Sequence, residues 1–97
     1  MRFARPQSGF NVSLTATVAA MIAAEIQREP IFERHWGDVI ERLKFTAHRD
    51  GVEEPRLGKG YRLTTFLGIQ SEARPKIIVG YLVLGDTVRI TLLSISR

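Results

Sequence analysis

The chain has 97 residues, no cysteine and a formal net charge of +4. Its length and its shares of hydrophobic (44%) and charged (25%) residues are typical of one soluble globular domain, which we expect to span residues 1–97. The absence of cysteine excludes disulfides, thiolate metal sites and thiol nucleophiles. No apolar run approaches the roughly 20 residues that a membrane-spanning helix needs, so we expect a cytoplasmic protein without membrane contact.

The positive charge is concentrated in the second half of the chain. Residues 56–97 carry seven basic and two acidic residues, whereas residues 1–55 carry seven basic and eight acidic ones. Such asymmetry favours an anionic partner, either nucleic acid or an acidic protein. The alternative is a solvated basic surface that only aids solubility.

The chain begins with a predicted arm, a strand and a helix. Residues 1–9 are expected to form a flexible arm, and the alternation of apolar and polar side chains over residues 10–15 predicts a short strand. Over residues 18–29 the apolar side chains recur at helical spacing, and the hydroxyl of Thr15 or Thr17 can cap the start of that helix.

A second amphipathic helix is predicted over residues 31–48, directly after Pro30. Trp36 lies on its apolar side and is expected in the core. Gly37 lies inside this helix, where glycine costs about 1 kcal/mol relative to alanine. We expect a close helix crossing at Gly37 to explain it.

Three strands are predicted after a loop over residues 49–60. They cover residues 61–67, 76–84 and 87–95, and Gly-Asp at positions 85–86 is typical of a tight hairpin turn. With the earlier elements, the order is β-α-α-β-β-β. This order predicts a two-layer α+β fold in which the helical hairpin packs on one face of a mainly antiparallel sheet.

Side-chain alternation predicts how these strands face the core. The middle strand is apolar almost throughout, which predicts a central strand covered on both sides. The outer two strands alternate, and each alternation predicts a set of residues on one face. These sets are Leu63, Thr65 and Leu67 on the first strand and Val88, Ile90, Leu92 and Ser94 on the last.

The order of elements and two stretches of sequence resemble the RelE/ParE superfamily of toxins from bacterial toxin–antitoxin pairs. Gly60-Tyr61-Arg62-Leu63 is similar to the family's strand after the helical hairpin. Residues 80–90 resemble its closing hairpin, in which a Tyr-X-Val strand turns through an acidic pair into a Thr-Val-X-Ile strand. The resemblance covers residues 10–97.

This resemblance implies an inhibitor of bacterial growth that a cognate antitoxin neutralises. RelE-like members cut messenger RNA on the ribosome without a metal or other cofactor, and ParE-like members act on DNA gyrase. A basic sheet face would meet the target, and a homodimer is one expected oligomeric state. Two other functions stay open: a catalytically inactive RelE-like module for protein–protein interaction, and a general RNA-binding domain.

Metal-free RNA cleavage needs a base, cations that hold the phosphorane charge and an acid for the leaving oxygen. The resemblance implies that basic residues on the helical segment and on the strands fill these roles, often with a C-terminal tyrosine or histidine. The candidate catalytic residues are Arg62, Lys76 and Arg97, and the candidate target-binding residues are Arg56, Lys59 and Arg89.

Two departures weaken the ribonuclease interpretation. Ile78 stands where many members have an arginine, and the last strand ends in Ile95-Ser96-Arg97 without the usual histidine or tyrosine. Arginine stays protonated and is a poor proton shuttle. His35 and His48 share no metal-ligand spacing, and we expect catalysis by neither.

Overall fold

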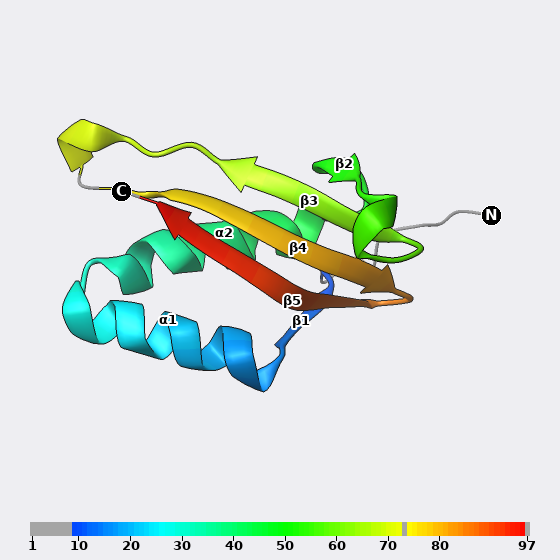
Figure 1. Ribbon diagram of the computed structural model, residues 1–97, viewed down its shortest axis with the longest axis horizontal. Helices are drawn as coiled ribbons and strands as arrows, with labels where there is room; N and C mark the ends of the chain where they lie inside the picture. The colour runs from blue at the N-terminus through cyan, green and yellow to red at the C-terminus, as the bar shows by residue number, and fades with distance from the viewer. Residues whose placement is uncertain (1–8, 73, 97) are drawn as a thin grey trace.

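The computed structural model of the chain describes residues 9–72 and 74–96. Both helices lie on one side of a five-stranded sheet with the strand order β1-β5-β4-β3-β2 (Figure 1). The predicted α+β fold and its order of main elements are thus confirmed. Of the flexible arm predicted over residues 1–9, only Gly9 falls within the described residues.

The first three elements are β1 (Asn11–Leu14), α1 (Ala16–Arg28) and α2 (Phe32–Thr46). Thr15 is the N-cap of α1, and its Oγ1 accepts a hydrogen bond from the backbone N–H of Val18 at 3.3 Å. This bond satisfies one of the free N–H groups at the start of the helix, which confirms Thr15 as one of the two proposed caps.

The second half contains the three predicted strands and three additional short elements. The main strands are β3 (Tyr61–Phe66), β4 (Lys76–Leu84) and β5 (Thr87–Ser96). The additional elements are the two-residue strand β2 (Val52–Glu53) and the 3-10 helices η1 (Pro55–Leu57) and η2 (Gln70–Glu72).

The strands pair mainly in antiparallel fashion. Each of the pairs β2/β3, β3/β4 and β4/β5 is antiparallel, and β1 runs parallel to β5 at the other edge. The predicted turn connects β4 to β5, and Gly85 adopts a φ of +62° there. Glycine adopts this left-handed conformation at no steric cost.

The core lies between the helices and one face of the sheet. Its sheet residues are Ile77, Val79 and Tyr81 of β4 and Val88, Ile90 and Leu93 of β5. Its helix residues are Val18 and Ile22 of α1 and Phe32, Trp36, Val39 and Leu43 of α2. Neither α1 nor α2 covers the opposite face of the sheet, where η1 brings only Leu57 close to Gly80. The prediction that β4 is covered on both sides along its length is therefore wrong.

A β-bulge on β5 corrects the predicted alternation of this strand. Gly80 pairs with Leu92, but the next residue, Tyr81, pairs with Ile90, so Thr91 has no partner in the register. The extra residue moves every later side chain to the other face. As a result Leu93 enters the core, and Leu92 faces away from the helices.

Gly37 does not mark a close helix crossing. It is exposed, and a Cβ atom built on it would meet nothing within 4 Å. The expectation of a tight contact at this position is therefore wrong, and Gly37 is a glycine in the exposed surface of α2.

Candidate functional site

The face of the sheet that turns away from α1 and α2 is covered by neither of them, and we call it the open face. It is identified by register, because its residues alternate along β3, β4 and β5 with those of the core. It consists of Tyr61, Leu63 and Thr65 of β3, Lys76, Ile78, Gly80, Leu82 and Leu84 of β4, and Arg89, Leu92, Ser94 and Ser96 of β5.

The centre of the open face is an apolar platform over Gly80. In the register, Gly80 lies between Leu63 and Leu92. A Cβ atom at Gly80 would lie 2.9 Å from the Cβ of Leu92, 3.3 Å from the Cδ2 of Leu63 and 3.6 Å from the Cδ1 of Leu57 in η1. These side chains therefore close over a position that only glycine fits. Leu57 stays 38% exposed and Leu84 55% exposed.

Only two of the candidate cations belong to the open face, and they lie near its opposite ends. Lys76 pairs with Ser96 at one end, and Arg89 pairs with Leu82 near the other. The six residue steps from Lys76 to Leu82 span about 20 Å of strand. Arg89 also reaches the sheet edge, where its Nη1 donates to the Oγ of Ser13 at 3.2 Å.

Arg62 lies on the helix side of the sheet. It pairs with Tyr81, whose side chain is buried in the core. Its Nε donates to the backbone carbonyl of Asp50 at 2.8 Å, and its Nη2 donates to that of Gly51 at 3.2 Å. The structure thus places Arg62 where it holds the segment after α2, and Arg62, Lys76 and Arg89 do not share a surface.

The hydroxyl of Tyr81 also holds the segment after α2. Its hydroxyl lies 2.9 Å from the carbonyl oxygen of Ala47 and 3.0 Å from that of Asp50, and it can donate its proton to either. Burial raises the pKa of Tyr81 above its usual value, and the nearby Arg62 guanidinium opposes that rise. The phenol is therefore neutral at physiological pH and acts as a structural donor.

The remaining sequence candidates lie outside the strands of the described chain or outside the described residues. Arg56 binds its neighbour Glu54, with 2.8 Å between Nε and Oε2, and this hydrogen bond lowers the pKa of Glu54. Lys59 is exposed in the turn before β3. Arg97 lies outside the described residues.

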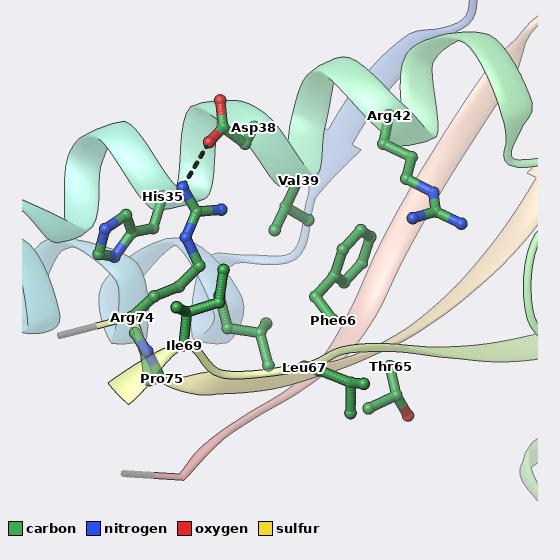
Figure 2. Close-up of a pocket in the computed structure, with 11 residues that line it drawn as sticks. His35, Asp38, Val39, Arg42, Thr65, Phe66, Leu67, Ile69, Arg74 and Pro75 are labelled. Carbon is green, nitrogen blue, oxygen red and sulfur yellow. Dashed lines mark hydrogen bonds and ion pairs between the residues drawn. The ribbon is translucent and has the colours of Figure 1, made fainter. Parts of the chain in front are cut away.

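A second polar cluster lies on the helix side, in a cavity of about 440 Å³ between α2 and the β3–β4 connection (Figure 2). Arg74 reaches across this cavity from the connection, and its Nη2 donates to Asp38 Oδ2 of α2 at 2.9 Å. His35 and Arg42 of α2 also line the cavity, and the Arg42 guanidinium lies 5.6 Å from the centre of the Phe66 ring.

The sequence analysis missed this cluster, although part of its signal was present. His35, Asp38 and Arg42 follow one another at steps of three and four, which places them on one face of a helix. Arg74 joins them only through the tertiary fold, because 36 residues separate it from Asp38. Its position in a polar loop carries no local signal.

Across residues 9–72 and 74–96, no group of three His, Asp or Glu side chains is arranged to hold a metal ion. None of the helices in the described part of the chain is long and apolar enough to cross a membrane.

Comparison with known proteins gives no relative for the chain. No protein-family model matches it, and no significant match was found among curated proteins or solved structures.

Proposed function

We propose that this chain is a RelE/ParE-type domain that works by binding proteins through its open face, and that it does not cleave RNA. The partly exposed apolar platform over Gly80 carries the proposal, because apolar side chains that gather on an uncovered surface are typical of sites of protein interaction. The fold supports the RelE/ParE assignment, since the order of the main elements and the one-sided helical layer agree with what the resemblance implies.

The placement of the charged residues argues against the ribonuclease alternative. The guanidinium of Arg62 is engaged with two backbone carbonyls on the helix side. On the open face, Ile78 occupies the position where the resemblance implies an arginine. Both histidines lie on α2 or its end, in the helical layer, so neither can carry a proton at the open face. A phosphorane formed there would have Lys76 and Arg89, about 20 Å apart, as its nearest cations among the described sheet residues.

The partner that fits the open face is an apolar segment with acidic flanks. Apolar side chains would cover the platform, and carboxylates near the two ends would meet Lys76 and Arg89. A cognate antitoxin with such a segment is the partner that we propose, and its binding would follow the usual pattern of an apolar centre with a polar rim. A protein target such as gyrase would then compete for the same face.

The proposal expects an adjacent reading frame that encodes a small antitoxin protein, and the experiment measures binding of that protein by titration calorimetry. Leu82→Glu places a carboxylate beside the platform, and we expect it to weaken binding about 100-fold, in the range of an interface hot spot. Met21→Glu makes the same type of change at an exposed apolar residue of α1 and should leave the affinity unchanged. Wild-type affinity of Leu82→Glu would contradict the proposal, provided that its circular dichroism spectrum matches wild type.

Growth arrest separates the two modes of action. Lys76→Ala removes the one catalytic candidate that lies on the open face within the described chain, and expression without the antitoxin should still arrest growth. Messenger RNA should stay uncut during this arrest, as measured by mapping of transcript ends. Cleavage that disappears in Lys76→Ala would instead establish the ribonuclease alternative.

A further inference from the structure

The helix-side cavity contains two buried nitrogen atoms without partners. Within the described residues, His35 Nδ1 and Arg74 Nε are the only buried side-chain nitrogen or oxygen atoms that have no hydrogen-bond partner. His35 is only 3% exposed. Both residues line the 440 Å³ cavity, and they also line a neighbouring hollow of about 540 Å³. Because buried polar groups nearly always have partners, two such atoms at one cavity indicate a missing partner.

We propose that this cavity binds a small organic acid through its carboxylate. Asp38 holds the Nη2 side of the Arg74 guanidinium at 2.9 Å, while Glu72 Oε1 lies 3.8 Å from Nε, too far for a hydrogen bond. Arg74 is thus oriented by Asp38 and lies within ion-pair distance of Glu72, but its Nε–H has no hydrogen-bond partner. A carboxylate has two oxygen acceptors, one for Arg74 Nε–H and one for the ring N–H of His35, and it matches the planar guanidinium.

The walls of the cavity select an acid with an apolar body over an inorganic anion. Val39 lines it from α2, Phe66 and Ile77 from the sheet, and Ile69 from the β3–β4 connection (Figure 2). Its volume lies within the range of about 300–1,000 Å³ that is typical of small-molecule sites. The ligand is therefore expected to bind with its carboxylate at Arg74 and its aromatic or aliphatic body against Phe66.

This site is independent of the proposed function. It lies on the helix side of the sheet, whereas the proposed protein-binding surface is the open face. Variants of Arg74 and His35 should leave binding at the open face unchanged, so failure of one proposal does not affect the other. The carboxylate has two sources with the same chemistry, a free organic acid and the C-terminus of a peptide.

The experiment is a nuclear magnetic resonance titration of the ¹⁵N-labelled chain with benzoate, acetate and inorganic phosphate. We expect benzoate to shift the His35 ring nitrogens and the Arg74 Nε–H in a saturable way, with an affinity about tenfold above that of acetate because acetate lacks the apolar body. Tighter binding of phosphate than of benzoate would overturn the proposal. An absence of saturable shifts would also overturn it.

Variants test the two donors. Arg74→Lys keeps the charge but removes the planar fork, and it should weaken benzoate binding about tenfold. Arg28→Lys, in the exposed pair with Glu25 on α1, is the matched control and should leave it unchanged. His35→Leu keeps the volume filled, removes one donor and should weaken binding about fivefold. Unchanged affinity in both Arg74→Lys and His35→Leu would refute the assigned contacts.

A peptide pair distinguishes the two sources of the carboxylate. A short peptide that ends in phenylalanine is titrated once as the free acid and once as the C-terminal amide. If the site takes a peptide C-terminus, the free acid binds more tightly than benzoate and the amide does not bind. If it takes a free organic acid, benzoate binds more tightly than either peptide. Binding of the amide as strongly as the free acid would overturn the role of the carboxylate.

Discussion

Arg62 and Tyr81 share one acceptor, and this geometry predicts that their effects on stability are not additive. Arg62 Nε lies 2.8 Å and the Tyr81 hydroxyl 3.0 Å from the carbonyl oxygen of Asp50. In Arg62→Met or Tyr81→Phe, that oxygen keeps one of the two donors. In the double variant it loses both and becomes an unsatisfied polar atom at the end of α2, which costs about 1 kcal/mol beyond the sum of the single changes.

The single changes set the scale. Arg62→Met removes hydrogen bonds from a charged donor and should lower the free energy of unfolding by about 1.5–2 kcal/mol. Tyr81→Phe should lower it by about 1 kcal/mol. Urea unfolding can be followed by the fluorescence of Trp36, the single tryptophan, which is buried in the core.

The control is Arg28→Met on the surface of α1, where the change should stay within about 0.5 kcal/mol of wild type. An equally small effect of Arg62→Met would refute the structural role and return Arg62 to the list of free functional cations. Additive single effects would show that the two donors do not share the Asp50 carbonyl in solution.

Four further predictions concern titration, packing and burial. Burial raises the pKa of Tyr81 in the folded state. The contribution of the Tyr81 phenol to stability is therefore complete below the usual phenol pKa of about 10 and is lost as the pH rises through the raised pKa. In urea titrations above about pH 10, the stability of wild type should fall more steeply with pH than that of Tyr81→Phe. Gly37→Ala should raise the free energy of unfolding by about 1 kcal/mol, because its Cβ meets open space. Gly80→Ala should lower it by about 1–3 kcal/mol, because its Cβ would lie 2.9 Å from Leu92 Cβ; thermal unfolding that shows equal effects of the two alanines would contradict this packing. His35→Leu should raise the unfolding free energy by about 1 kcal/mol, since it removes a buried nitrogen without a partner, and a loss of stability in calorimetry would show that this nitrogen is satisfied.

The helices and the last hairpin could be predicted because their signals are local. The cap of α1 is a threonine whose hydroxyl accepts a hydrogen bond from the N–H three residues later. The apolar residues of α1 and of α2 recur at helical spacing within each helix. The turn at Gly85 needs a residue that tolerates a positive φ, and the glycine that meets this need is visible in the sequence. The signal for β4 is also local, a run of apolar and β-branched residues, and the predicted bounds agree with the observed Lys76–Leu84.

The face to which each strand residue points could not be predicted, because it depends on long-range pairing. Leu63 and Thr65 do lie on one face, as their alternation indicates, but that face turns away from the helices. On β5 the bulge at Thr91 exchanges the faces of Leu92 and Leu93, and no residue type in this stretch signals it. A shift of one residue moves every later side chain to the other side of a sheet.

The alternation of strand residues between the two faces of the sheet also explains why a basic half of the chain does not make a basic surface. Arg62 and Arg74 lie on the helix side, where they bind carbonyls and a carboxylate. Lys76 and Arg89 lie near opposite ends of the open face, separated by apolar side chains. A net charge counted along the sequence adds these cations together, whereas the strands present only Lys76 and Arg89 on the open face. Counterion release scales with the number of contacts to the anion, so binding at the open face should depend weakly on salt, while a domain that holds RNA there would lose affinity steeply as salt rises.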